Sequence, residues 1–331
     1  MPSPLRHSIY FFVLSSLFLG TLKNDTSYWE TSTSFLNIIC FFLILTIGIS
    51  HGSLDHIKGY KLLKKYEIKN KINFYLGYLL ISIFIIFLWF FLPTFTLVLF
   101  LILATYHFGK EDVLYNTRKN FFQFLLLGSP IILAPLSFHF EETLNIFRIL
   151  YVNNENLINI FYFFDKKNIF KILLIIFLII GLYIIDHKHL NFLKIERAGG
   201  YKDYYVSQFF SAYRQMFVLE KAGIIILNFT CHPLIAFTIY FCFLHSIRHS
   251  FKLSNELNDK DFKKGFRDFL NKALPLTLIA AILFVVCLIF LTNYYVLNEV
   301  ILKVIFIGLA SLTFPHILLE YLLEKNEKQK N

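Results

Sequence analysis

Long apolar runs alternate with short polar breaks along almost the whole chain. A helix needs about 20 apolar residues to cross the roughly 30 Å hydrocarbon core of a bilayer, and several runs approach or reach that length. Pro93 and Pro233 interrupt two of the longest stretches, because proline cannot continue a helix. The pattern predicts helices over the following ranges: 8–22, 34–52, 73–92, 95–109, 121–138, 168–185, 213–230, 233–250, 273–292 and 297–322. The expected fold is therefore all-α, a polytopic integral membrane bundle of about ten transmembrane helices.

The composition agrees with this fold class. Hydrophobic residues make up 56% of the 331 residues and charged residues only 16%, whereas soluble domains carry about 25% charged residues. No polar stretch is long enough to bury a core of its own. We therefore expect one membrane domain over residues 1–331.

The net charge of +10 does not indicate a nucleic-acid partner, because the basic residues lie in short loops between predicted spans. Cytoplasmic loops of membrane proteins keep an excess of Lys and Arg. The basic segments are 55–71, 110–120, 186–203, 248–268 and 324–331, and the neutral or acidic ones are 23–32, 139–145 and 293–299. These segments alternate correctly only with ten spans and both termini in the cytoplasm, so an even number of spans is favoured.

Five of the eleven histidines fall at the cytoplasmic ends of four predicted spans: His51, His107, His245, His249 and His316. His245 and His249 are four residues apart, which places both rings on one helical face, where two imidazoles can bind one metal ion. A carboxylate follows three of the others at the same spacing: Asp55 after His51, Glu111 after His107, and Glu320 after His316. Metal-bound histidines commonly donate their second ring nitrogen to such a carboxylate.

A single histidine at a membrane boundary is more often a packing or interfacial residue than a ligand. Polar side chains are costly in lipid, however, and their convergence from several helices indicates a shared site. The four cysteines are scattered without CxxC spacing, so imidazole ligation favours Fe, Cu, Zn or Ni over Mg or Ca. Four neutral histidines would leave a coordination position open for a small molecule such as dioxygen, and lipid on all sides suggests an apolar substrate.

Four motifs occur in one order along the chain: "HGSLDH" (51–56), "YHFGKED" (106–112), "PLIAFTIYFCFLHSIRHS" (233–250) and "FPHILLE" (314–320). Together they resemble the Brp/Blh family of integral-membrane carotenoid cleavage enzymes, the bacterial and archaeal β-carotene 15,15'-dioxygenases. The resemblance covers residues of about 34–323, which would form the catalytic core. It implies central cleavage of β-carotene by O2 to two all-trans-retinal, with a histidine-bound Fe(2+). It also implies a multi-pass protein of the cell inner membrane, in contact with lipid, whose product passes to a microbial rhodopsin.

The resemblance also assigns roles to residues. The family's ligands correspond to His51, His107, His245 and His249. Two further histidines, His56 and His316, match family positions as an extra ligand or as neighbours of the ligands. By their spacing, Asp55 would orient His51 and Glu111 would orient His107.

Tyr106 and Phe108 flank one expected ligand. Their rings could line the substrate pocket and stabilise positive charge that develops on a polyene by cation–π attraction.

Two other classes compete with this interpretation. A membrane desaturase or hydroxylase with two iron ions needs about eight histidines in HxxxH and HxxHH boxes, and this chain has one HxxxH and no HxxHH. A transporter or haem protein would belong to a different class. A transporter usually shows mid-span charges or broken paired helices, and mid-span charges are scarce here, whereas a haem protein would show a Soret band.

Overall fold

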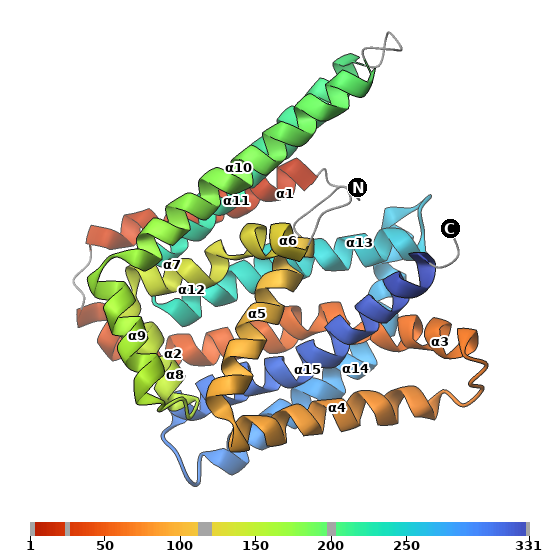
Figure 1. Ribbon diagram of the computed structural model, residues 1–331. Helices are drawn as coiled ribbons and strands as arrows, with labels where there is room; N and C mark the ends of the chain where they lie inside the picture. Colours follow the sequence, from red (N-terminus) through yellow and green to blue (C-terminus); the bar gives the residue numbers. More distant parts are fainter. Residues whose placement is uncertain (1–3, 24–26, 112–120, 197–202, 329–331) are drawn as a thin grey trace. The chain divides into compact units, whose positions relative to one another are not determined.

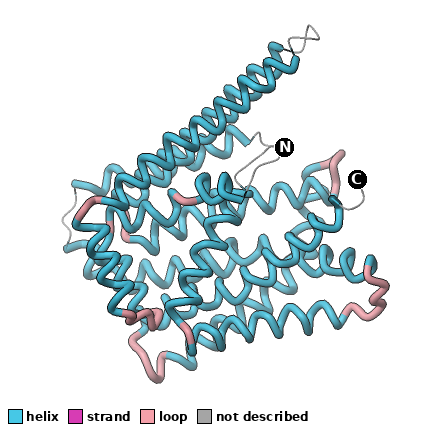
Figure 2. The backbone as a smooth tube through the Cα atoms, viewed as in Figure 1, coloured by secondary structure: helices cyan, strands magenta, loops and turns pink. Residues whose placement is uncertain are grey.

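The computed structural model describes residues 4–23, 27–111, 121–196 and 203–328. Within these ranges the side chains at 21–23, 27–33, 51, 186–196, 203–210 and 327–328 are not described. The structure is 90% helical, with no strand among the described residues, and short loops join the helices (Figure 2). Seven of the described helices are long and apolar enough to cross a membrane. The chain is therefore a polytopic helical membrane protein.

The backbone divides into two compact units, each assembled from segments that are distant in sequence. The first comprises residues 1–29, 105–144 and 155–245. In it α1 lies along α11, while α10 packs on both α7 and α11, so that α10 and α11 lie side by side as a long hairpin (Figure 1). Its elements are α1 (Pro4–Leu17), η1 (Phe18–Lys23), α6 (Phe121–Gly128), α7 (Pro130–Phe138), α9 (Glu155–Lys166), α10 (Ile169–Glu196), α11 (Asp203–Thr230), α12 (Pro233–Ile239) and most of η4 (Tyr240–Ser246).

The second unit comprises residues 30–104, 145–154 and 246–331. In it α4 packs along α15, and α14 packs on α13 and η3. Its elements are most of α2 (Ser27–Leu43), then η2 (Ile44–Gly48), η3 (Ile49–Leu54), α3 (Asp55–Lys65), α4 (Ile72–Phe91), α13 (Ile247–Leu257), α14 (Phe262–Leu291) and α15 (Leu297–Lys328). Two further helices are divided between the units: α5 (Pro93–Glu111) after Ala104, and α8 (Phe140–Ile149) after Leu144.

The two proline breaks lie where the sequence predicts them. Helix α4 ends at Phe91 and α5 begins at Pro93, while α11 ends at Thr230 and α12 begins at Pro233. Proline is well suited to the first position of a helix, because the backbone N–H that it lacks would have no partner there. Both predicted breaks are confirmed.

Among the described residues, fewer helices than the predicted ten meet the length and hydropathy expected of a span. The described residues give seven helices that are long and apolar enough to cross a membrane, or eight if the bent pair of α9 and the start of α10, which meet at 71°, forms one span. Helices α1 and α11, both predicted as spans, are not among them. Helix α1 has only 14 residues, and α11 buries two ionisable side chains, Glu220 and Lys221.

Candidate metal centre

Two buried histidines of the first unit lie side by side. His107 is on the last turns of α5 and His245 is near the end of η4, and each side chain is 3% exposed. Their ring centres are 5.3 Å apart. The ring of Phe108 meets His245 edge-on at 4.8 Å, and Phe241 stacks on it at 5.7 Å. Both imidazoles therefore stand in aromatic, water-poor surroundings.

The glycine of the "YHFG" motif explains how α5 places His107. A Cβ added at Gly109 would overlap the backbone carbonyl oxygen of Phe124 on α6, and one added at Gly128 would overlap that of Thr105 on α5. The end of α5 and α6 therefore approach backbone to backbone through two glycines. This close packing fixes the turn that carries His107, a small-residue contact of the kind that membrane helices use.

Both segments that carry the first and third histidine motifs contain a π-helical turn. η2 ends just before "HGSLDH", and η4 contains His245. The hydroxyl of Ser246 donates a hydrogen bond to the carbonyl oxygen of Gly48, at 3.3 Å, which ties the end of η4 to η2. Short π-helical turns are rare and occur frequently at functional sites. The two π-helical turns among the described residues thus lie in or next to segments that carry histidine motifs.

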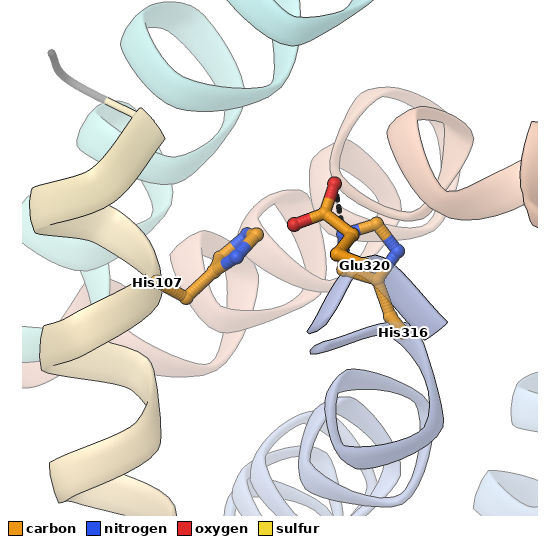
Figure 3. A group of neighbouring side chains, drawn as sticks. All are labelled: His107, His316 and Glu320. Carbon is orange, nitrogen blue, oxygen red and sulfur yellow. Dashed lines mark ion pairs between the residues drawn. The ribbon is translucent and has the colours of Figure 1, made fainter. Parts of the chain in front are cut away.

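The second unit contributes its own pair of buried histidines. His249 on α13 is 2% exposed and His316 on α15 is 3% exposed, with ring centres 6.1 Å apart. Figure 3 shows His316 and Glu320 on α15 with their ion pair, and His107 on α5. The spans that carry His249 and His316 are also the most enclosed of the seven, 67% and 72% buried. The backbone of His51 belongs to η3, but its side chain lies outside the described part of the chain.

Asp55 has a different partner from the one that its spacing suggests. Its two carboxylate oxygens lie 2.9 and 2.8 Å from Nδ1 of His316, and Asp55 itself is 4% exposed. Because a carboxylate only accepts hydrogen bonds, the Nδ1 of His316 carries the proton and donates it. We predicted that Asp55 orients His51, and this stays a prediction, because the His51 side chain lies outside the described part of the chain. The described contacts of Asp55 join it to His316 on another helix.

Glu320 lies on the other side of the His316 ring, as its spacing predicts. Its Oε1 is 3.8 Å from Nε2 of His316 and accepts a hydrogen bond from the Lys58 ammonium group at 3.3 Å. Both carboxylates around His316 therefore belong to a network that joins α3 to α15. The second predicted orienting carboxylate, Glu111, is half-buried one turn after His107, and its role stays a prediction.

His56 occupies different surroundings. Its Nδ1 is 2.9 Å from the carbonyl oxygen of Ser53, and its ring lies against Tyr60 at 5.8 Å and parallel to Tyr75 at 6.5 Å. The described rings beside it are thus phenols rather than other histidines.

The two aromatic residues expected to line the substrate pocket differ in position. Tyr106 stacks on Phe121 at 5.1 Å and meets Phe124 edge-on at 5.6 Å, so that it packs on α6. Phe108 is 6% exposed and contacts His245 directly. Of the two, Phe108 is the ring that borders a candidate ligand.

Comparison with known proteins identifies the family. The family model of beta-carotene 15,15'-dioxygenase matches residues 42–324, which include all four histidine motifs. The chain belongs to this family. It is also 26% identical, over 279 residues, to a beta-carotene 15,15'-dioxygenase of Uncultured marine bacterium 66A03, an alignment that covers 84% of this chain and 90% of that protein. No solved structure matches the chain.

Membership in the dioxygenase family makes the chain an oxidoreductase enzyme that cleaves β-carotene. A dioxygenase also suggests a metal cofactor, and His107, His316 and Glu320 are side chains that could bind one. With metal–nitrogen bonds of about 2.1 Å, two adjacent imidazoles on one ion have ring centres about 4.5–5.5 Å apart. The separation of 5.3 Å in the first unit agrees with that range, and the separation of 6.1 Å in the second unit is wider. Imidazole and carboxylate donors suit non-haem iron, so these histidines and the glutamate fit an iron cofactor.

Three residues near the candidate ligands and their carboxylate neighbours were not expected from the sequence. Tyr78 places its hydroxyl 3.1 Å from Asp55 and from the carbonyl oxygen of Leu312, Lys58 pairs with Glu320, and Gly109 sets the packing of α5. Tyr78 is one of 19 tyrosines, and Lys58 lies in a lysine-rich segment, so nothing in the sequence distinguishes either residue from others of its type. Gly109 could have been noticed, because it is the glycine of the "YHFGKED" motif.

Proposed function

We propose that the enzyme cleaves β-carotene at the central 15,15' double bond with dioxygen, giving two molecules of all-trans-retinal. We further propose that His51, His107, His245 and His249 hold one ferrous ion for this reaction. The carrying observation is the family match over residues 42–324, which contains all four histidines. Further support comes from the burial of the three whose side chains are described.

Bound ferrous iron supplies the activation of dioxygen. The protein's part is to hold the ion and to place the polyene. Buried imidazoles bind as neutral ligands, and Phe108, packed against His245, would border the central part of the substrate. Holding one double bond beside the ion supplies orientation, which contributes several kcal/mol to catalysis in favourable cases. No dedicated acid–base pair is required.

The substrate is long and apolar, so it would partition into the bilayer and enter from the side. Helices α4 and α14 are largely exposed: only 17% and 11% of an apolar 18-residue stretch of each helix is buried. In a membrane this surface faces lipid, where β-carotene resides. A substrate that dissolves in lipid needs no aqueous entrance.

The basic segments of the chain support a proposal for its orientation in the membrane. The lysine-rich segment 55–71 directly follows the "HGSLDH" motif, and cytoplasmic loops retain such residues. We place the ion at the cytoplasmic side of the cell inner membrane, with both termini in the cytoplasm. Retinal is apolar as well and would remain in the membrane, where a microbial rhodopsin would take it up.

The function is tested by expression in bacteria that accumulate β-carotene. The orange colour should bleach while retinal appears, and His107→Ala should abolish both changes at equal protein levels. His139→Ala is a matched control, since His139 is a half-buried histidine of the first unit that pairs with Glu142. Cleavage products of other lengths, or full activity of His107→Ala, would contradict the proposal.

A further inference from the structure

His316 is bonded to a carboxylate, a partner that commonly orients metal-binding histidines. Its Nδ1 donates to the Asp55 carboxylate, with distances of 2.9 and 2.8 Å to the two oxygens. Histidines that bind metal ions almost always donate their other ring N–H to a carboxylate, a backbone carbonyl or water. The bond fixes both the tautomer and the plane of the ring, so that Nε2 of the neutral imidazole presents its lone pair.

Asp55 is in turn fixed from a third helix. The Tyr78 hydroxyl on α4 lies 3.1 Å from Oδ2 of Asp55 and 3.1 Å from the carbonyl oxygen of Leu312. Both are acceptors, so the single hydroxyl proton links α4 either to Asp55 or to the turn of α15 just before His316. Pro315, inside α15, removes one backbone hydrogen bond of that turn. Helices α3, α4 and α15 thus combine to set the direction of one imidazole.

The other ring nitrogen of His316 is buried beside a polar group: Nε2 is 3.8 Å from a Glu320 oxygen. The His249 ring centre is 6.1 Å from that of His316. Two adjacent imidazoles on one ion, with metal–nitrogen bonds of about 2.1 Å, have ring centres about 4.5–5.5 Å apart, so a bound ion would draw these two rings closer together. His56, the other extra histidine of the motifs, lies instead against Tyr60 and Tyr75.

We propose that His316 is an additional ligand of the ion, binding through Nε2, and that Asp55 is its positioning residue. This inference rests on the proposed ion site and adds a fifth protein ligand to the four histidines. Tyr78 supports it by holding Asp55. One further imidazole leaves a six-coordinate ion a single position for a small molecule, in place of two.

The experiment measures Co²⁺ binding by the full-length protein in detergent, because the ligand-field spectrum of Co²⁺ reports the number of ligands. His316→Ala should weaken Co²⁺ binding and change the spectrum, and added imidazole should restore the wild-type spectrum. Asp55→Asn should weaken binding by about 10–100-fold, the usual cost of losing such a partner, and Tyr78→Phe should weaken it less. His139→Ala should leave affinity and spectrum unchanged.

The outcomes separate the inference from the proposed function. If His107→Ala loses Co²⁺ while His316→Ala and Asp55→Asn both keep wild-type affinity and spectrum, His316 is not a ligand and the four-histidine site stands. If the wild-type protein takes up no Co²⁺ or iron, the ion site itself is refuted. Should His316→Ala fail to elute as a folded species, Asp55→Asn and Tyr78→Phe decide, since both keep the shape of the replaced side chain.

Discussion

At the residue scale, His232 offers a test of buried charge away from the metal site. It is the N-cap of α12, where its Nδ1 accepts a hydrogen bond from the backbone N–H of Leu234 at 3.4 Å. Burial lowers the pKa of His232, the positive potential of His139 lowers it further, and Glu142 partly opposes the shift. The folded protein therefore binds this proton less readily than the unfolded chain does.

The sign of the pH dependence follows. Because the folded-state pKa of His232 lies below the unfolded value of about 6.5, its contribution to stability is present above that pH and is lost as the pH falls through it. Asparagine is a good N-cap and does not titrate. His232→Asn should therefore lose less thermal stability than the wild type between about pH 7.5 and about pH 5.5, measured by thermal unfolding in detergent. An identical pH slope for both proteins would contradict the assignment.

Phe108 is the residue through which the reaction can be tested without removing a ligand. Phe108→Leu keeps an apolar side chain beside His245 but removes the ring face, so retinal formation should fall roughly 2- to 30-fold, the range expected from a cation–π contribution of about 0.5–2 kcal/mol. Iron content should stay at the wild-type level. Phe138→Leu, which changes a ring that packs on Phe229, is the control. Unchanged turnover in Phe108→Leu would exclude the role of this ring.

Helical spacing predicted Glu320 as a neighbour of His316, but it did not predict the contact of His316 with Asp55. Depth in the membrane and helical spacing are encoded along one chain, and they singled out His107, His245, His249 and His316, all of which are buried. A contact such as Asp55 with His316 joins positions 261 residues apart. Spacing within one helix gives no information about such a contact, because a neighbouring helix can bring a closer partner.

At the element scale, the packing of α5 on α6 gives the sharpest prediction. Gly109→Ala would place a methyl group into the carbonyl oxygen of Phe124, and because this is backbone, α5 must move away. We expect a lower unfolding temperature and a loss of retinal formation, since His107 is two residues away. Gly77→Ala is the matched control, because a Cβ there meets nothing within 4 Å, and alanine should favour helix α4 by up to about 1 kcal/mol. Equal stability of the two variants would refute the close contact.

A second element-scale prediction concerns a buried lysine near the start of α15. Lys303 is 5% exposed, donates to the carbonyl oxygen of Ile149, and lies over the rings of Tyr151 and Tyr295 at 4.2 and 4.7 Å. Lys303→Met should lower stability by about 1–3 kcal/mol, because it leaves a buried acceptor without its partner. Lys263→Met, at an exposed position of α14, should have little effect in the same thermal unfolding assay. Equal unfolding temperatures would show that the lysine does not link these segments.

The helix ends at prolines were predictable, whereas the irregular turns were not. Pro93 and Pro233 interrupt the helices because proline has no backbone N–H. This property belongs to the residue itself and can be read from the sequence. The π-helical turns η2 and η4 lie in apolar stretches with no proline, "ILTIG" and "YFCFLHS". Their geometry depends on contacts with other segments, such as Ser246 on Gly48, which the sequence of either segment alone does not specify.

At the scale of the whole molecule, hydropathy predicts the class of fold better than the number of spans. The polytopic helical fold follows from composition alone. Among the described residues the count of candidate spans is lower than ten, because α11 combines an apolar character with buried Glu220 and Lys221 and because α9 and α10 meet at a bend of 71°. The division into two units was not expected, since each unit draws on three separate stretches of the chain and no change in composition marks their limits.

The count of spans decides where the ends of the chain lie, and this can be measured. An even number, eight or ten, puts both termini on one side, whereas seven puts them on opposite sides. The lysine-rich segment 55–71 and the basic segment 324–331 should both remain in the cytoplasm. Green fluorescent protein fused after residue 70 or at the C-terminus should therefore fluoresce, and alkaline phosphatase should be active only when fused in the neutral turn at 293–296. Phosphatase activity at residue 70 would reverse the orientation and move the first histidine motif to the outer side. Activity at the C-terminus alone would favour seven spans and would move the fourth motif, in the C-terminal half of α15, away from the first, which would contradict a shared site on the cytoplasmic side.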